Sequence, residues 1–373
     1  EMTSSLVGSE MCIRDSSYTC MTMNQIVVSC GRSRSSDLKL SRTKKLLTAC
    51  SADFSLNGVS NMPSATTMNV AAVVVTFNRL EKLKKVLASL EAQTRLPEQL
   101  IIVNNASTDD TASYLDEYEK NFSLKDKVKI TIVTLPENAG GAGGFSAGMR
   151  KGYEFGADFV WIFDDDGYPQ PTALEKLLVG YDHAVEGLGP DVPYVCSMVK
   201  FIDGSISEMN NPIPTWDWGR LQAMGYDNLV MVTQCSFVSV LIPRWVMEAF
   251  GLPYKEYFIW FDDAEYTLRI TKACPGVEVL DSVVLHDMGV NQGVNYSMVN
   301  EKNVWKFSYG ARNEGSYRYH HRSKGNYLMF CLTVWNAMRR GRVAKPLRRK
   351  ICKQLVKAIR FNPKVDFPQQ SQH

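Results

Sequence analysis

The chain has 373 residues, of which 45% are hydrophobic and 22% are charged, and its formal net charge is +3. This composition suffices for a hydrophobic core in one large domain or two, and it excludes a disordered protein. The net charge is too small to indicate nucleic acid as a partner, so we expect none.

The cysteines and the apolar runs bear on where the chain works. Its nine cysteines lie far apart, without a Cys-x-x-Cys pair, which argues against a disulfide framework or a structural zinc site. A reducing compartment, the cytoplasm, is therefore predicted. The longest apolar run, 327–338, is shorter than the roughly 18 residues that span a bilayer, so we expect no membrane-spanning helix.

Residues 1–67 differ in composition from the rest of the chain. Ser, Thr, Arg and Met are frequent, acidic residues are sparse, and no apolar periodicity is visible. We interpret this segment as a disordered leader, with a targeting peptide as the alternative. The stretch 4–16 (SSLVGSEMCIRDS) also resembles translated adapter sequence. Part of the leader is therefore suspected not to be native, and we assign it no function.

From Val70 onward the sequence alternates between strand and helix patterns. The run 70–76 is apolar almost throughout, as in a strand buried on both faces, and leucines at helical spacing follow within 79–93. The same order recurs in a strand at 99–103, a helix at 111–118 and a strand at 129–134. This alternation predicts an α/β fold of Rossmann-like type, with a mostly parallel central sheet flanked by helices. Such sheets bind ligands at the carboxyl ends of their strands.

The next predicted strand, 159–163 (FVWIF), runs directly into three aspartates. A helix at 171–185 completes this unit, because Pro171 is suited to a first helical turn. Beyond about residue 194 the pattern is less regular. We expect a mixed sheet region there, with strand-like segments at 230–243 and 277–285.

Asp164, Asp165 and Asp166 lie where an α/β sheet binds its ligands. Three adjacent carboxylates repel one another, and burying them is costly unless a cation compensates their charge. In an extended segment Asp164 and Asp166 point to the same side, so this pair suits a Mg²⁺ or Mn²⁺ ion that also contacts phosphate oxygens. The alternative is an acidic turn at the end of a strand.

Four segments resemble, in the same order, the motifs of the family 2 glycosyltransferases. They are VVVTFNR (73–79), LIIVNNASTDDT (100–111), ENAGGAGGFSAGMRKG (137–152) and WIFDDDG (161–167). The resemblance implies a GT-A fold and an enzyme that transfers a sugar from a nucleotide sugar, usually with inversion. It runs from about Val70 to about Asn313. We therefore predict a GT-A domain at 68–315, with a nucleotide-binding half at 68–190 and an acceptor half at 191–315, followed by a basic helical extension at 316–373.

The resemblance also implies which residues hold the nucleotide. Asn104 stands where many family members have an Asp that reads the base, which leaves the identity of the base open. Asn138, Gly140 and Gly141 match a glycine-rich turn beside the nucleotide, although an ordinary glycine-rich loop would look the same. The complete nucleotide-binding set is predicted to be Thr76, Phe77, Asn78, Arg79, Asn104, Asn138, Gly140, Gly141, Asp164 and Asp165.

The metal ligands and the catalytic base follow from the same resemblance. For Mn²⁺ or Mg²⁺, the predicted ligands are Asp164, Asp166 and His286. His286 matches a histidine that completes the metal site in related galactofuranosyltransferases, and the alternative is a structural residue at a strand end. In YFIWFDDAEYTLR (257–269) Asp263 matches the base that takes the proton of the acceptor hydroxyl, with Asp262 its neighbour. These two acids could also cap the helix that follows them.

The predicted reaction is transfer of galactofuranose from UDP, or as a second choice rhamnose from dTDP, to a hydroxyl of a glycan or lipid-linked glycan.

A phosphatase of the haloacid dehalogenase type is the main alternative, because Asp164 in Asp-x-Asp-Gly also resembles the nucleophile of those enzymes. They usually carry this motif on the first strand, whereas two or three strand–helix units precede it here. A dehydrogenase would need a third glycine where Ser146 stands. A non-catalytic glycan-binding module with the same fold is a further alternative.

A basic amphipathic helix is predicted at 339–360. Such a helix is typical of a membrane-surface anchor and would suit a lipid-linked acceptor. We therefore predict a cytoplasmic enzyme that is peripheral at the inner face of the cell membrane. A solvated helix face or an acidic protein partner is the alternative, and the oligomeric state is open. The apolar residues interleaved with its Lys and Arg residues are Leu347, Ile351, Leu355, Val356 and Ile359.

Overall fold

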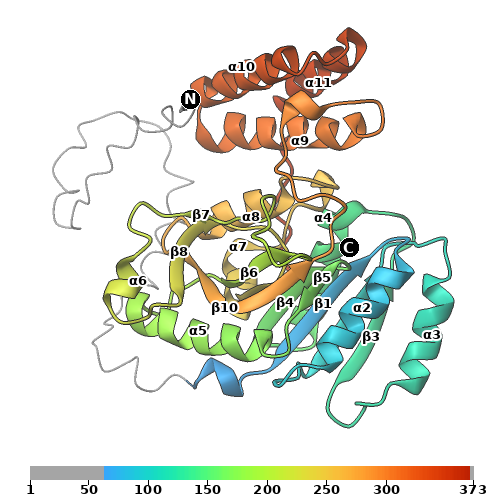
Figure 1. Cartoon of the computed structure of the whole chain (residues 1–373), viewed down its shortest axis with the longest axis vertical. Helices are drawn as coiled ribbons and strands as arrows, with labels where there is room; N and C mark the ends of the chain where they lie inside the picture. The colour runs from blue at the N-terminus through green and yellow to red at the C-terminus, as the bar shows by residue number, and fades with distance from the viewer. Residues whose placement is uncertain (1–62, 370–373) are drawn as a thin grey trace, which may run out of the picture. The chain divides into compact units, whose positions relative to one another are not determined.

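Ten strands form one sheet within residues 63–369, the part of the chain that this computed structural model describes. The first four are β1 (Val70–Thr76), β2 (Gln99–Asn104), β3 (Lys129–Thr134) and β4 (Phe159–Asp164). The others are β5 (Gly167–Pro169), β6 (Val195–Phe201), β7 (Ile213–Pro214), β8 (Leu229–Gln234), β9 (Val240–Pro243) and β10 (Gly276–His286). Their order is β3-β2-β1-β4-β9-β6-β10-β8-β7, with β5 paired to β10 (Figure 1).

The pairing is parallel in the first half of the sheet and mixed in the second. Strands β3, β2, β1 and β4 are parallel, whereas β9 is antiparallel to both β4 and β6. Because β10 is parallel to β6, it runs in the same direction as β4. The predicted α/β class is therefore confirmed, and the carboxyl ends of β1, β2, β4 and β10 meet at one edge of the sheet.

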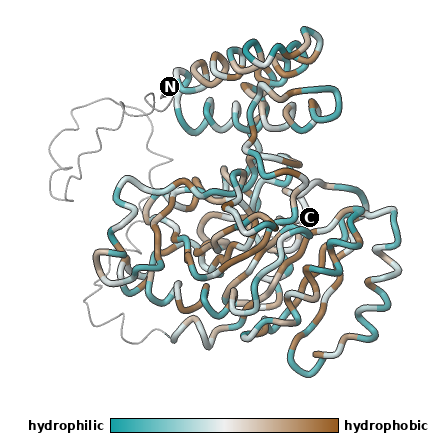
Figure 2. The backbone as a smooth tube through the Cα atoms, viewed as in Figure 1, coloured by the Kyte–Doolittle hydropathy of each residue, from teal (hydrophilic) through white to brown (hydrophobic). Residues whose placement is uncertain are grey.

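Helices cover both faces of the sheet (Figure 1). Alternate residues of β1 separate the two layers, since Ala72 packs in one core cluster and Val73 in the other. The strands carry the most hydrophobic stretches of the trace (Figure 2). One layer holds α2 (Leu80–Glu91), α3 (Thr111–Asn121) and α5 (Ala173–Leu188). The other holds α4 (Gly140–Glu154), α7 (Arg244–Phe250) and α8 (Asp262–Ile270). A short α6 (Arg220–Ala223) precedes β8.

Helix α4 was not anticipated, because its sequence GGAGGFSAGMRKGYE is rich in a residue that disfavours helices. Two of its glycines face β1 at very close range. A Cβ on Gly144 would lie 2.3 Å from Val75, and one on Gly148 would lie 2.3 Å from Val73. These glycines therefore allow the helix to pack closely on the sheet. Most of the glycine-rich motif has this packing role, and only its first residues form the turn that was predicted.

Three helices follow the sheet, namely α9 (Val304–Tyr317), α10 (Lys324–Arg340) and α11 (Lys345–Ala358). A π-helical turn at Arg318–Arg322 joins the first two. Their buried apolar residues form one cluster that includes Phe307, Val334 and Ile351. Since α9 supplies part of this core, the helical extension begins near residue 304. No helix in the described part of the chain has both the length and the apolar character to span a membrane.

The basic helix predicted at 339–360 differs from the structure in two respects. It is interrupted at 341–344, between α10 and α11. Its residues Leu347, Ile351 and Leu355 are buried in the cluster with α9, whereas Val356 is 66% exposed. Most of its apolar face is therefore already covered by the protein.

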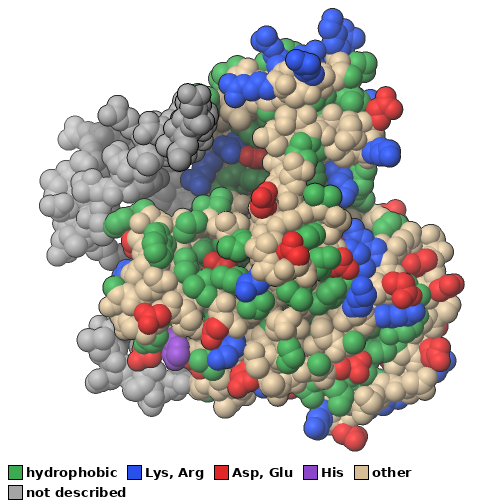
Figure 3. Space-filling view, viewed as in Figure 1, with side chains coloured by type: hydrophobic (Ala, Val, Ile, Leu, Met, Phe, Trp, Pro, Cys, Tyr) green, Lys and Arg blue, Asp and Glu red, His purple; other side chains and the backbone are tan. Residues whose placement is uncertain are grey.

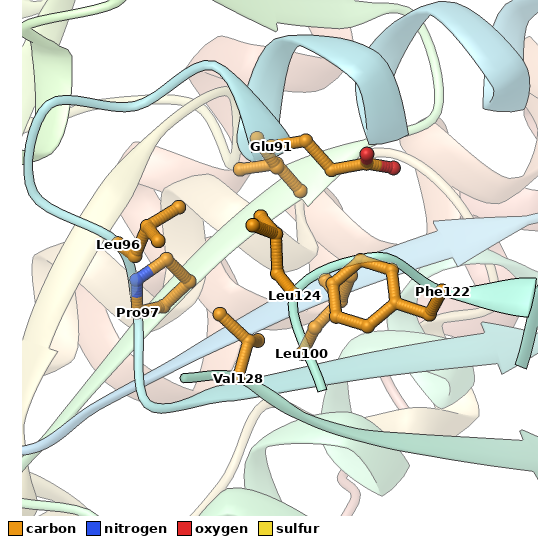
Figure 4. Close-up of a pocket in the computed structure, with 8 residues that line it drawn as sticks. Glu91, Leu96, Pro97, Leu100, Phe122, Leu124 and Val128 are labelled. Atoms are coloured by element: carbon orange, nitrogen blue, oxygen red, sulfur yellow. The ribbon is translucent and has the colours of Figure 1, made fainter. Parts of the chain in front are cut away.

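The leader predicted at 1–67 lies outside the described residues except for its last five. Within those five, Ala65 is buried, and its backbone amide donates to Asp182 of α5. At the amino ends of the strands, a small apolar cavity of about 10 Å³ lies between α2, α3 and β2 (Figure 4). It is barely large enough for one water molecule and lies at the opposite end of the strands from the three aspartates.

Candidate active site

The carboxyl ends of four strands bring the predicted site residues together. Thr76 ends β1 and is level with Asn104 of β2, while Asp164 ends β4 beside Val75. His286 ends β10 and pairs with Gly167, which follows the three aspartates directly. The sheet therefore places the predicted nucleotide and metal residues at one edge, where α/β sheets bind ligands.

The three aspartates have different partners. Asp165 accepts hydrogen bonds from Thr76 Oγ1 at 2.8 Å and from Arg79 at 3.1 Å. Asp166 accepts from Arg79 at 2.8 Å and from Lys82 Nζ at 3.3 Å. The half-buried carboxylate of Asp164 has no hydrogen bond or ion pair with any residue of the described range 63–369. Of the three, Asp164 is therefore the one without an ion-pair partner among the described residues, although the charge of Arg79 acts on it from a distance.

The pKa values of these carboxyl groups follow from these contacts. Burial, then the charges of Asp166 and Asp165, raise the pKa of Asp164 well above its usual value. Burial also raises the pKa of Asp165, against the opposing charge of Arg79. Burial pushes the pKa of Asp166 upward too, but the hydrogen bond and charge of His286, with Arg79 and Lys82, outweigh it and lower this pKa to about 2. A cation beside Asp164 would remove the penalty on its ionised form.

The imidazole of His286 is oriented by a neighbouring amide. Its Nδ1 lies 2.7 Å from Oδ1 of Asn210, and its Nε2 lies 3.2 Å from Oδ1 of Asp166. Asn210 is itself held, because its Oδ1 accepts from Ser207 Oγ at 2.8 Å and its Nδ2 donates to Ser236 Oγ at 2.8 Å. Since Oδ1 can only accept, Nδ1 carries the proton. Nε2 is left on the side of Asp166, so the ring is held through one nitrogen and directs the other toward a carboxylate, which is the arrangement of a metal-binding histidine.

The donor set fits a divalent cation but is not fully assembled. Carboxylate oxygens from Asp164 and Asp166 suit Mg²⁺ or Mn²⁺, and an imidazole nitrogen is accepted by Mn²⁺. Within residues 63–369, no three His, Cys, Asp or Glu side chains are close enough to one another to hold a metal ion. Asp166 and His286 are adjacent, so Asp164 would complete the set by a local movement.

Two asparagines connect the loops that were predicted to hold the nucleotide. Asn78, at φ 54°, accepts from the amides of Thr108 and Asp109 through Oδ1. Asn105, which is 2% exposed, donates to Asn138 Oδ1 at 3.1 Å and to the Gly140 carbonyl at 3.0 Å. These bonds fix the loops after β1, β2 and β3 to one another.

The predicted nucleotide residues differ in how accessible they are. Phe77 is 37% exposed and is free to stack on a planar group. Asn104, by contrast, is 1% exposed, and its Oδ1 accepts from the Ser107 amide at 2.9 Å. Gly141 lies in the first turn of α4, between Gly140 and Ala142, whose backbone amides already donate to Asn138 Oδ1 and to the Phe258 carbonyl. A base-reading role for Asn104 would require this buried side chain to give up its present contact.

Gly140 begins α4 in a backbone conformation that favours glycine, at φ 71°. A Cβ at this position would lie 2.0 Å from the carbonyl oxygen of Phe258. The same oxygen accepts a hydrogen bond from the amide of Ala142 at 3.2 Å. The turn beside the nucleotide loops is therefore in direct contact with the segment that leads to the predicted base.

Replacing Gly140 with Ala is expected to lower the free energy of unfolding by about 3 kcal/mol, because the clash is with backbone and the positive φ adds strain. Chemical denaturation of both proteins measures the change. Gly156→Ala is a matched control, since Gly156 also has a positive φ, 78°, but nothing lies within 4 Å of its Cβ position. If both variants lost the same free energy of unfolding, the contact between Gly140 and the Phe258 carbonyl would not limit the residue at position 140.

Asp262 and Asp263 begin helix α8, and neither of them is its N-cap. That position belongs to Phe261, which is in the left-handed region at φ 70°. Asp262 is 8% exposed, and its charge is among those that raise the pKa of Asp164. Asp263 is half-buried, and its Oδ1 accepts from the Ala264 amide at 2.6 Å. Asp262 is therefore the member of the pair that interacts with Asp164, while Asp263 is the more accessible.

Burial raises the pKa of both acids of this pair. The pKa of Asp262 rises to about 8, through burial and then the charge of Asp263. Burial raises the pKa of Asp263 to about 6, although backbone hydrogen bonds oppose it. At neutral pH Asp263 is therefore the better proton acceptor of the two.

Several residues of the site were not found from the sequence. Lys82 contacts Asp166 and the backbone carbonyl of Asp287, and Tyr168 donates to Asp287 Oδ2 at 2.9 Å. Lys82 could have been noticed, because it lies one helical turn after Arg79 and so faces the same side. Asn105 and Asn210 lie in polar loops without periodicity, and no sequence signal identified them.

Comparison with known proteins shows which sequences this chain resembles. Residues 71–231 match the glycosyl transferase family 2. Galactofuranosyltransferase GlfT1 of Mycolicibacterium smegmatis is 35% identical over 232 residues, which cover 60% of this chain and 72% of the relative. The dTDP-rhamnosyl transferase RfbF of Shigella flexneri is 26% identical over 215 residues, which cover 54% of this chain and 62% of the relative.

A solved structure, that of GalNAc-T7 with UDP, GalNAc and Mn²⁺, is similar at a lower level. It is 14% identical, covers 75% of this chain and 57% of that chain, and has a TM-score of 0.48, which is too low to bear on the site. The 35% identity to GlfT1 over 72% of that relative, together with the matched motifs, is sufficient to assign the chain to a family. The chain belongs to the family 2 glycosyltransferases and is a transferase, as the four ordered motifs predicted.

Proposed function

We propose that this enzyme transfers galactofuranose from UDP-galactofuranose to a hydroxyl of a glycan or lipid-linked glycan, with inversion. The observation that carries the proposal is the meeting of Asp164, Asp166 and His286 with Arg79 at one sheet edge. The similarity to GlfT1 supports galactofuranose, and the weaker similarity to RfbF keeps dTDP-rhamnose as the second choice.

In this proposal Asp164, Asp166 and His286 hold a Mn²⁺ or Mg²⁺ ion. When bound, such an ion neutralises charge on the leaving nucleoside diphosphate. Arg79 and Lys82 already form ion pairs with Asp166, so in this proposal they would also contact the diphosphate that such an ion holds. Thr76 and Asn78 shape the loop after β1, and Phe77 offers its exposed ring to the base. The residues of the chain therefore bind and orient the donor.

Asp263 acts as the base in this proposal. Its pKa of about 6 leaves it ionised at neutral pH, so it can accept the proton of the acceptor hydroxyl as that oxygen attacks the sugar. Asp262, with a pKa of about 8, stays largely protonated and limits the negative charge beside Asp164. The two neighbouring acids thus have different tasks because their environments separate their pKa values.

The haloacid dehalogenase alternative receives no support from the fold. Its nucleophile motif belongs on the first strand of a domain, whereas Asp164 ends β4, after three strands of the parallel half. Membership of the family 2 glycosyltransferases also makes a transferase the simpler account of the same residues.

A donor screen tests the proposed function. Thermal unfolding is measured with UDP-galactofuranose, dTDP-rhamnose and a GDP-sugar, each with and without Mn²⁺. A ligand at about a hundred times its Kd adds roughly 2.7 kcal/mol, so we expect a clear stabilisation by the UDP-sugar that depends on Mn²⁺. A folded protein that is stabilised by none of these donors would contradict the proposal.

Replacing Asn210 with Leu is expected to weaken Mn²⁺ binding about 10- to 100-fold, because His286 would lose the acceptor that fixes its protonated nitrogen. Electron paramagnetic resonance of free Mn²⁺ measures the Kd in the presence of UDP. In a protein that carries His286→Ala, the same substitution should have no further effect, since the two residues act through one contact. If Asn210→Leu weakened Mn²⁺ binding just as much in the His286→Ala protein, Asn210 would affect the metal site other than through His286.

The C-terminal helices suggest where the enzyme works. Residues 315–365 contain no Asp or Glu, while Lys and Arg are frequent. Exposed on α10 are Leu328, Met329, Leu332 and Trp335, at 60%, 64%, 57% and 40%. Lys and Arg side chains gather over α10 and α11, with hydrophobic side chains between them (Figure 3). We propose that the exposed face of α10 binds an anionic membrane surface peripherally. The apolar side of 339–360 contributes less, because most of it is buried against α9.

Liposome flotation checks this surface. Substituting Leu328, Leu332 and Trp335 together with Ser should lower binding to anionic vesicles at least tenfold, while neutral vesicles bind neither protein. Ile213→Ser with Trp216→Ser is the control, because these residues, at 50% and 93%, are also exposed but lie in β7 or just after it. Unchanged vesicle binding of the triple variant would exclude α10 as the contact.

A further inference from the structure

The segment that leads to Asp262 has an unusual backbone. Phe258, Trp260 and Phe261 all have positive φ values, of 65°, 65° and 70°. Outside this segment the described residues contain four other non-glycine residues with positive φ, namely Asn78, Ala106, Ser239 and Arg342. Each such residue costs on the order of 1–3 kcal/mol and persists only if surrounding contacts hold it. Something must therefore hold residues 258–261.

Asn313 of α9 supplies these contacts. Its side chain is fully buried, and its Nδ2 donates to the carbonyls of Tyr257 at 2.9 Å, Ile259 at 3.2 Å and Trp260 at 2.8 Å. Its Oδ1 accepts two hydrogen bonds from the guanidinium of Arg312, at 3.0 and 2.9 Å. Because a guanidinium can only donate, the amide orientation of Asn313 is fixed, and its NH₂ group must point at the loop.

Other side chains of α9 support the same segment. The ring of Phe258 stacks on Tyr309 at 4.8 Å, and the ring of Trp260 packs edge-on against Phe307 at 4.8 Å. Gly310 leaves room for Trp260, since a Cβ there would lie 3.0 Å from its ring. On the other side, the Phe258 carbonyl contacts Gly140 and accepts from Ala142, as described above. The segment is thus held between the nucleotide turn and α9.

We infer that Asn313 is a positioning residue for the acidic pair Asp262 and Asp263. It fixes the three carbonyls that precede α8, and the conformation of this segment decides where the first residues of that helix lie. The inference rests on the proposed function, because it assigns Asn313 a task in the same reaction. It also means that α9 contributes to the reaction through the position of this segment. A displacement of about 1 Å is sufficient to lower a rate by about 10²-fold.

The test compares wild type with Asn313→Leu, which preserves size but removes the donors. We expect kcat for sugar transfer to fall 10- to 100-fold, with KM for the nucleotide sugar and Kd for UDP unchanged within about twofold. Hydrogen exchange should increase in residues 257–264 and nowhere in the parallel sheet. Asn121→Leu at the exposed end of α3 is the control. A wild-type kcat, or an equal loss of UDP affinity, would overturn the inference.

A second variant keeps the test decisive if Asn313→Leu does not fold. Gly310→Ala improves helix propensity by about 1 kcal/mol but pushes against Trp260. We expect a folded protein with a lower kcat and faster exchange in 257–264, whereas an unchanged kcat would contradict the role of the segment. Hydrogen exchange and UDP binding do not depend on turnover. If wild type bound no nucleotide and transferred no sugar, the proposed function would fail, while the exchange result would still decide whether Asn313 holds the loop.

Discussion

Replacing Asp263 with Asn is expected to lower kcat by about 10²- to 10⁴-fold, because the amide cannot take the proton of the attacking hydroxyl. The substitution preserves size, and the side chain of Asp263 makes only a local contact with the Ala264 amide. KM for the donor should therefore change little, and the thermal stability at neutral pH should not fall, because burial penalises the ionised carboxylate that the substitution removes. Steady-state kinetics with a saturating acceptor measure the effect.

Two further variants make this result specific. Asp262→Asn should retain most of the activity at pH 7, since Asp262 is largely protonated there with a pKa of about 8. Asp116→Asn, on the exposed side of α3, should behave as wild type. If Asp262→Asn abolished transfer while Asp263→Asn did not, the base would have to be reassigned to Asp262.

The pH profile provides the same distinction without a substitution. Asp263 must be ionised to act as a base, and its pKa is about 6. We therefore expect kcat/KM to be constant above about pH 7, to be halved near pH 6 and to fall about tenfold per pH unit below about pH 5. An inflection near pH 8 instead would indicate Asp262.

The second large effect is expected at Asp166, where Asn should lower kcat about 10³-fold and weaken Mn²⁺ binding. The Asp166 carboxylate contacts Arg79, Lys82 and His286 and is a proposed metal ligand. Without this carboxylate the site loses negative charge that would hold the ion beside the diphosphate. The ion is expected to stabilise the transition state by several kcal/mol. If excess Mn²⁺ restored full activity, the substitution would have affected only metal affinity. A variant with wild-type kinetics at low Mn²⁺ would exclude Asp166 as a ligand.

Stability must be measured beside activity in this variant, because Asp166 also stabilises the fold. Its pKa is about 2 in the folded protein and 3.8 for an unperturbed Asp, which corresponds to about 2 kcal/mol. Since the folded-state pKa is the lower one, this contribution is present above about pH 4 and is lost as the pH falls toward 2. Asp166→Asn should therefore be less stable than wild type at pH 7, and the difference should shrink near pH 2.

The sheet was predictable from the sequence because buried parallel strands are continuous apolar runs. Strands β1 and β3 match their predicted ranges, and β2, β4 and α5 differ by only a few residues. Helix α4 was missed because its glycines serve close packing on β1, and local propensity does not report such tertiary contacts. The basic helix at 339–360 was misjudged for a related reason. Amphipathicity identifies an apolar face but does not say whether another helix already covers it.

The candidate site was predictable only where motifs follow strands. Asp164, Asp166 and His286 could be placed because each lies at a strand end, and the sheet brings strand ends together. Asn210 and Asn313 could not, since each acts through contacts between segments far apart in the chain. Asn313 lies about 50 residues after the loop that it holds, on a helix with its own apolar core. Neither spacing nor residue type distinguishes such an asparagine from a surface residue.

The measurement that tests the central claim most directly is product analysis by NMR after incubation with UDP-galactofuranose, Mn²⁺ and a glycan acceptor. We expect a new galactofuranosyl linkage whose anomeric configuration is opposite to that in the donor, and no such product from Asp263→Asn. A product with the donor's configuration would contradict the base mechanism. Simple hydrolysis of phosphate esters, abolished by Asp164→Asn and without sugar transfer, would contradict the proposed function altogether.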